Sequence, residues 1–154
     1  MSSDRSQPKS KTLATWAAIL GGPFGLHRFY LYGLNDRLGW LCPIPTLLGA
    51  WGVRRVFDLG QNDQLAWLLL PVLGFMVAAC MLQAIVFGLT SDEAWHARHN
   101  AQVPEAERPA SGWGVVIGIV VALLVGATVL MSTIAFSGQR YFEYQIEEAL
   151  KMSQ

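Results

Sequence analysis

The stretch GGPFGLHRFYLYG, from Gly21 to Gly33, decides the fold because it places a histidine and an arginine inside an otherwise apolar region. The apolar run before it starts at Thr12 and has fifteen residues before His27, whereas a helix that spans a bilayer needs at least ~17. A longer helix would carry Arg28 into the lipid, which costs ~2.5–3.5 kcal/mol at the bilayer centre. The chain is therefore expected to bend in this stretch.

The segment Gly21-Gly22-Pro23 is suited to form the bend. Its glycines loosen a helix, its proline cannot donate a backbone hydrogen bond, and Gly25 adds a further flexible point. We expect a helix from about Lys9 to Leu20, and then a second short segment that holds His27-Arg28 at the water interface. The aromatic residues that follow suit the level of the lipid headgroups, namely Phe29, Tyr30 and Tyr32.

The composition is that of a membrane protein. Hydrophobic residues make up 53% of the 154 residues and charged residues only 14%, whereas soluble domains average about 25% charged residues. The net charge is zero, so no overall basic field favours nucleic acid as a partner. Both cysteines, Cys42 and Cys80, lie in apolar runs and are expected to pack as small hydrophobic side chains.

Three further apolar runs follow the bend. The runs Leu65–Ser91 and Ala110–Gln139 contain no charged residue and exceed the ~20 residues that a helix needs to cross the hydrocarbon. They must be helical, because lipid offers no partner to backbone N–H and C=O groups. The run Leu38–Val53 has sixteen residues and two prolines that suit a helix start, so a crossing from about Pro45 to Asp58 is expected.

These runs predict an all-α integral membrane helical bundle with about four transmembrane segments and a broken first helix. Whether the first segment spans the bilayer or re-enters it is left open by the sequence. The expected divisions are an N-terminal tail (1–8), a unit with the first two crossings (9–63), a third transmembrane helix (64–91), an extracytoplasmic loop (92–110), a fourth transmembrane helix (111–139) and a C-terminal helical tail (140–154).

The basic residues favour a cytoplasmic location for both termini. Positive residues favour the cytoplasmic side, and four crossings with the N-terminus inside would place seven basic residues inside and four outside. No small-x-small cleavage site follows the first apolar run, so we expect an uncleaved anchor. The inside set is Arg5, Lys9, Lys11, Arg54, Arg55, Arg140 and Lys151, and the outside set is Arg28, Arg37, Arg98 and Arg108.

Small residues recur every four positions along the fourth apolar run. Close contact through small residues drives the association of helices in lipid, where the hydrophobic effect is absent. Two uses of this face are open: packing against other helices of the same chain, or dimerisation. The residues concerned are Gly114, Gly118, Ala122 and Gly126.

The motif around the bend resembles that of the two-transmembrane-helix domain family. It consists of Lys9-Ser10-Lys11, an apolar run, Gly22-Pro23-Phe24-Gly25, His27-Arg28-Phe29-Tyr30 and Gly33. The second crossing adds Gly49-Ala50-Trp51-Gly52-Val53 and Asp58, so the resemblance covers Lys9 to Asp63. The whole chain is similar to the bacterial NINE-type variants, which add two crossings. Animal members often have aspartate where this chain has His27, which argues against a carboxylate-based role there.

The resemblance implies a membrane-embedded helical hairpin, in the bacterial cytoplasmic (inner) membrane, without an agreed biochemical activity. The motif and structural residues that it singles out are Gly22, Gly25, His27, Arg28, Phe29, Tyr30, Gly33 and Asp58. Arg28 is expected to be held by an acidic partner, by backbone carbonyls at the break, or by phosphate headgroups. Asp58 is a candidate partner only if the first segment re-enters the membrane.

The sequence offers little catalytic chemistry. It has no G-x-S-x-G motif and no glycine-rich loop with a phosphate-binding lysine, and His96 and His99 alone are a weak metal-binding pair. We expect no enzyme activity, no cofactor and no metal. The predicted role is structural, accessory or interaction-based, with membrane lipids and a homo-oligomer or another membrane protein as partners. The alternative is a small transporter or channel subunit, because the broken first helix resembles the discontinuous helices of transporters.

Overall fold

The structure, a computed structural model, describes residues 7–153, which form helices and connecting loops without a strand in that range. Most of the predicted N-terminal tail, residues 1–6, lies outside the described residues. The elements in chain order are α1 (Lys11–Gly21), the 3-10 helix η1 (Gly22–Phe24), α2 (Leu26–Tyr32), α3 (Arg37–Leu41), α4 (Pro43–Leu59), α5 (Gln64–Leu89), α6 (Asp92–His99), the 3-10 helix η2 (Glu105–Glu107) and α7 (Trp113–Met152). The predicted all-α class is confirmed.

Two helices, α5 and α7, are long and apolar enough to cross a membrane. Only 22% of the most apolar window of α5 and 17% of that of α7 are buried within the protein, so most of this apolar surface faces outward. The expected four transmembrane segments are not supported, since α1 has 11 residues and α4 has 17. An 11-residue helix is about 16 Å long, roughly half the thickness of the hydrocarbon.

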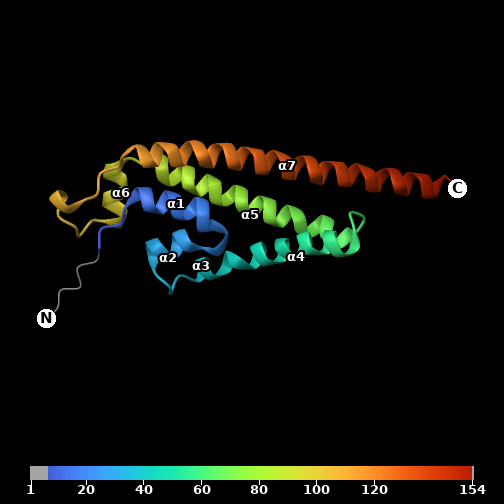
Figure 1. The fold of residues 1–154 in the computed structure, drawn as a ribbon, viewed down its shortest axis with the longest axis horizontal. Coiled ribbons are helices and arrows are strands. Elements are labelled where there is room, and N and C mark those ends of the chain that lie inside the picture. Colours follow the sequence, from blue (N-terminus) through green and yellow to red (C-terminus); the bar gives the residue numbers. More distant parts are fainter. Residues whose placement is uncertain (1–6, 154) are drawn as a thin grey trace.

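The first apolar segment is broken where the sequence predicts. The chain leaves α1 through η1, and Gly25 follows in a left-handed conformation with φ of 78°. A side chain at Gly25 would also collide with the carbonyl oxygen of Gly39. After the break α2 returns antiparallel to α1, since the Ser10 N–H donates to the Tyr30 hydroxyl at 2.8 Å. The first segment therefore folds back on itself as a helical hairpin (Figure 1).

Helices α3 and α4 follow nearly one line (Figure 1). Cys42 between them keeps a helical conformation, with φ of −56° and ψ of −40°. Pro43 and Pro45 have no N–H for the carbonyls of the preceding turn, which explains the local interruption. The Thr46 hydroxyl bonds the Cys42 carbonyl at 3.2 Å and the Pro23 carbonyl at 2.8 Å, so it ties this joint to the break in the first segment.

The small residues of α7 face the interior of the bundle. A Cβ at Gly118 would lie 2.9 Å from Thr15 Cγ2, and one at Gly126 would lie 2.8 Å from Met81 Cβ. Ala122 between them is fully buried, and Gly114 lies against Thr12 of α1. The small-residue face is therefore occupied by α1 and α5 of the same chain, which is the intramolecular alternative.

Contacts at the two ends of α5 show which segments of the chain lie together at each end of the bundle. Lys11 forms an ion pair of 2.6 Å with Asp92, the first residue of α6, close to the C-terminal end of α5. At the opposite end of α5 the Arg140 guanidinium lies 4.7 Å from the centre of the Trp67 ring. The expected placement of the N-terminal segment and loop 92–110 on opposite sides is wrong, because they are in contact. Because the first segment folds back as a hairpin, the N-terminal segment and loop 92–110 lie at the same end of the bundle.

The predicted C-terminal helical tail is a direct continuation of α7. The helix runs unbroken from Trp113 to Met152, and Figure 1 shows its last turns extending beyond the turn between α4 and α5. With a rise of 1.5 Å per residue the whole helix is about 60 Å long, twice the thickness of the hydrocarbon. The last turns therefore stand clear of the packed bundle.

Candidate functional site

Arg28 is held at the turn between α2 and α3. Its Nε donates to Asp36 Oδ2 at 2.5 Å and its Nη2 to Asp36 Oδ1 at 3.3 Å. The same carboxylate caps α3 by accepting the Gly39 N–H at 3.0 Å, and the Arg28 bonds lower the pKa of Asp36 below its ordinary value. Gly33 ends α2 with φ of 82°, and its N–H bonds the Phe29 carbonyl. We name this arrangement the first arginine corner.

A second arginine corner of the same design joins α4 to α5. Arg55 Nε and Nη2 donate to the two oxygens of Asp63 at 2.7 and 2.9 Å, and they lower the pKa of that carboxyl. Asp63 caps α5 through the Ala66 N–H at 3.0 Å, and Gly60 ends α4 with φ of 87°. In each corner a tryptophan Nε1 closes the turn by bonding the carbonyl just after the glycine: Trp40 to Leu34 and Trp67 to Gln61.

The two corners arise from an internal repeat that the sequence analysis missed. Both follow the pattern R-x-x-x-x-G-x-N-D-x-L-x-W-L, and each residue of the second copy lies 27 positions after its counterpart in the first, as Arg55 does after Arg28. Comparing the chain with itself would have found this signal and identified Asp36 as the partner of Arg28. The candidate partner Asp58 is wrong, since it forms an exposed ion pair with Arg54 at 3.4 Å.

Energetic coupling should be present between Arg28 and Asp36 and absent between Arg28 and Asp58. When two residues share an ion pair, the double variant loses less stability than the sum of the two single variants. The losses of stability for distant residues instead add up. Arg28→Ala, Asp36→Ala and their double variant form one thermodynamic cycle, and Asp58→Ala replaces the second residue in the control cycle. Denaturation of the purified protein in detergent measures both. Additive losses for Arg28 and Asp36 would contradict the described geometry.

The chain before α1 is anchored on α6 by backbone bonds of Lys9. The Lys9 N–H donates to Asn100 Oδ1 at 2.8 Å, and its carbonyl accepts bonds from Asn100 Nδ2 and from Trp95 Nε1. Trp95 and Asn100 are each 2% exposed. Tyr30 belongs to the same anchor through Ser10, so it is not free among headgroups as expected. No sequence pattern predicted this anchor, because its partners lie 91 residues apart.

The ion pair of Lys11 and Asp92 should make the anchor sensitive to acid. Bonds from Lys11 and Ser111 lower the pKa of Asp92 below its ordinary value. A carboxyl with a lowered folded-state pKa stabilises the fold above pH ~4, and this contribution is lost as the pH falls through the folded-state value. The effect is modest, at most ~1 kcal/mol, because the Asp92 side chain is 44% exposed.

We therefore expect Asp92→Asn to lower the melting temperature at pH 7 and to have no effect well below pH 4. Melting curves of both proteins in detergent between pH 2 and 7 check this. As a control, Glu93→Gln changes the neighbouring exposed carboxyl and should shift the melting temperature equally little at every pH. A constant difference between the wild type and Asp92→Asn over the whole range would refute the assignment.

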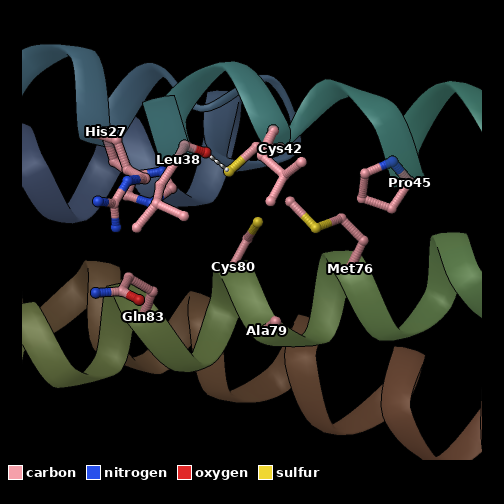
Figure 2. Close-up of a pocket in the computed structure, with 10 residues that line it drawn as sticks. His27, Leu38, Cys42, Pro45, Met76, Ala79, Cys80 and Gln83 are labelled. Atoms are coloured by element: carbon pink, nitrogen blue, oxygen red, sulfur yellow. Dashed lines mark hydrogen bonds between the residues drawn. The ribbon is translucent and has the colours of Figure 1, made fainter. Parts of the chain in front are cut away.

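His27 points into the protein and does not lie at the water interface as expected. It is 4% exposed and packs against Phe87 of α5, with ring centroids 6.0 Å apart. Its Nδ1 is buried and has no hydrogen-bond partner among the described residues. The side chain lines a cavity of about 290 Å³ between α2, the α3–α4 joint and α5, together with Arg28, Cys80 and Gln83 (Figure 2).

A second cavity, of about 680 Å³, lies between α2, the end of α5 and α6. Gln83 lines both cavities, and Tyr32, Arg98 and His99 provide polar groups in the second. His99 stacks on Trp95 at 4.5 Å, and its burial lowers the pKa of its imidazole. We refer to the two cavities together as the α2–α5 groove.

The structure brings most of the singled-out residues together around the break. Gly22 lies against Cys80 of α5, since a Cβ there would be 2.6 Å from Cys80 Cβ. Phe29 packs against Trp40 in the first corner, with ring centroids 5.2 Å apart.

Within residues 7–153 no three histidine, cysteine or acidic side chains converge as metal ligands, and His96 bonds Asn100 through its Nδ1.

Comparisons with models of protein families, with curated proteins and with solved structures found no match to this chain.

Proposed function

We propose that the chain is an integral membrane protein with a structural, accessory or interaction role and no catalytic activity, of the type that the two-transmembrane-helix motif suggests. The observation that carries the membrane assignment is the outward-facing apolar surface of α5 and α7, whose most apolar windows are only 22% and 17% buried. The helix of a soluble core would bury most of such a surface. The polar residues support a scaffold, because Arg28, Arg55 and Lys11 each bond a carboxylate that fixes a turn or helix end.

The proposed topology has three crossings and one re-entrant hairpin. The crossings are α3 with α4, α5 and α7, and the hairpin is α1 with α2. Residues 37–59 give a rod of about 34 Å, which is long enough for the hydrocarbon. The end with the N-terminal segment then carries Lys9, Lys11, Arg28, Arg37, Arg98 and Arg108, against Arg54, Arg55, Arg140 and Lys151 at the other end. This excess favours an N-terminus in the cytoplasm and a C-terminus outside, in the bacterial inner membrane.

Single-cysteine labelling of intact cells tests this topology. In a background with Cys42 and Cys80 replaced by alanine, we expect Gln7→Cys and Ala106→Cys to react on one side of the membrane and Gln61→Cys and Ser153→Cys on the other. Four crossings would instead place Ala106 alone on its side. Release of the protein by alkaline carbonate would end the membrane assignment altogether.

The second candidate function is a small transporter or channel subunit. It is favoured by the break between α1 and α2, which leaves the buried His27 beside a cavity, because transporters form their sites at such broken helices. Proteoliposomes separate the two functions. A scaffold gives no ion or solute flux above that of empty liposomes, whereas a flux that Gly25→Val abolishes would establish the transporter.

A further inference from the structure

The two cavities of the α2–α5 groove lie next to each other along α5. Gln83 lines both of them, and Arg28 of the first lies 5.2 Å from the centre of the Tyr32 ring of the second. Along α5 the linings extend from Met76 to Thr90, which corresponds to about 21 Å at 1.5 Å per residue. The groove thus runs from the end of the bundle that holds α6 toward its middle.

The groove changes character along its length. Near α6 it offers Arg98, His99 and the Tyr32 hydroxyl. Deeper it is lined mainly by apolar and sulfur-containing side chains such as Pro45 and Met76 (Figure 2). No acidic side chain lines either cavity among the described residues. A charged mouth above an apolar floor is complementary to an anionic molecule with a long hydrocarbon chain.

His27 lies at the level between the two parts, where it is one of the polar groups that line the groove. It is 96% buried, and its Nδ1 has no partner among residues 7–153, although buried polar atoms are almost always hydrogen-bonded. A neutral imidazole offers one donor and one acceptor. Gln83 faces the same level with a side-chain amide. These two side chains are polar groups that a ligand would meet at this depth.

We propose that the α2–α5 groove binds one anionic phospholipid of the cytoplasmic leaflet. Its phosphate lies at Arg98 and His99, its glycerol esters lie near His27 and Gln83, and one acyl chain lies along Met76 and α4. This inference rests on the proposed function, because it requires insertion in the membrane with the α6 end in the cytoplasm. Basic pockets between transmembrane helices on that side are suited to anionic headgroups.

The proposal is tested directly by measuring which lipids the purified protein retains. The purified full-length protein is placed in nanodiscs with equal amounts of phosphatidylglycerol and phosphatidylcholine, extracted gently and weighed by native mass spectrometry. We expect phosphatidylglycerol to be retained about fivefold over phosphatidylcholine, the factor expected for one basic residue at an anionic surface. Arg98→Gln should abolish the preference. Arg37→Gln is the matched control, since Arg37 is exposed at the same end and lies outside the groove.

Two further variants test the deeper part of the groove. Ala79 is exposed on the groove floor, so Ala79→Leu should fill the acyl-chain site and reduce retention of both lipids several-fold. Ala135→Leu makes the same change on an exposed face of α7 outside the groove and should have no effect. His27→Phe keeps a ring against Phe87 but removes the nitrogens, and it should reduce retention of both lipids while Arg98→Gln changes only the preference.

Equal retention of the two lipids by the wild type, or unchanged retention in Ala79→Leu, overturns the proposal. Glycerol phosphate distinguishes a lipid from a free phosphate ligand. If it raises the melting temperature as much as short-chain phosphatidylglycerol at the same concentration, the acyl chain plays no part and the lipid assignment fails. A protein that resists carbonate extraction but shows no lipid preference overturns this inference alone, whereas a protein that carbonate releases overturns the proposed function as well.

Discussion

Replacing Gly49 with alanine is expected to destabilise the protein by about 3 kcal/mol, although alanine is the better helix former. Gly49 lies in α4 where the helix meets α5, and a Cβ there would lie 2.8 Å from both the Cα and the backbone N of Leu73. Backbone atoms cannot rotate away as a side chain can, so the two helices must separate. Denaturant titration of the purified protein in detergent, followed by circular dichroism, measures the loss.

Gly138 provides the matched control for this substitution. It is also a helical glycine, in α7, but a Cβ there would meet nothing within 4 Å. Gly138→Ala is therefore expected to be neutral or to stabilise the protein by up to ~1 kcal/mol through helix propensity. Equal effects of the two substitutions would show that α4 and α5 are not in the close contact described here.

Replacing Trp95 with alanine is expected to cost about 4 kcal/mol, within the range for the largest buried side chains. Trp95 packs between Phe87 and His99, with ring centroids 5.7 and 4.5 Å away, and it holds the Lys9 carbonyl through its Nε1. Its loss therefore opens a cavity and releases the N-terminal segment from α6. The expected signs are a lower melting temperature and faster labelling of a cysteine introduced at Gln7.

Two other variants separate packing from hydrogen bonding at this position. Trp95→Phe keeps an aromatic ring and loses the bond to Lys9, so it should cost only ~1–2 kcal/mol. Trp113→Ala removes an indole that is 81% exposed and should leave the melting temperature in detergent unchanged. If Trp95→Ala behaves like Trp113→Ala, the anchor contributes nothing to stability.

The features that were predictable from sequence depend on properties of a few adjacent residues. The break at Gly21-Gly22-Pro23 follows from a missing N–H and missing side chains, and α5 and α7 follow from long uncharged runs. The helical tail after residue 140 follows likewise from its periodic apolar face. Each of these signals comes from residues adjacent in sequence, so the feature can be predicted without knowledge of the fold.

The features that were not predictable depend on contacts between distant segments. The N-terminal segment lies beside α6 because the Lys9 backbone forms hydrogen bonds with Asn100. No sequence pattern near either residue predicts this pairing. His27 is buried because α5 brings Phe87 against it, whereas its neighbours in sequence suggested a wet environment. The expectation that the N-terminal segment and loop 92–110 lie at opposite ends was wrong for the same reason. The arginine corners are an intermediate case, since their repeat is visible in the sequence.

The unbroken course of α7 has a mechanical consequence. Arg140 rests on Trp67 at the end of α5, and the helix continues from there to Met152 without a proline or an interruption, a distance of about 18 Å. The part of α7 that projects from the bundle therefore pivots at Arg140, where the packed helices end. Any tilt of the packed portion of α7 therefore displaces Ile146 and Leu150 by a larger distance than it displaces residues within the bundle.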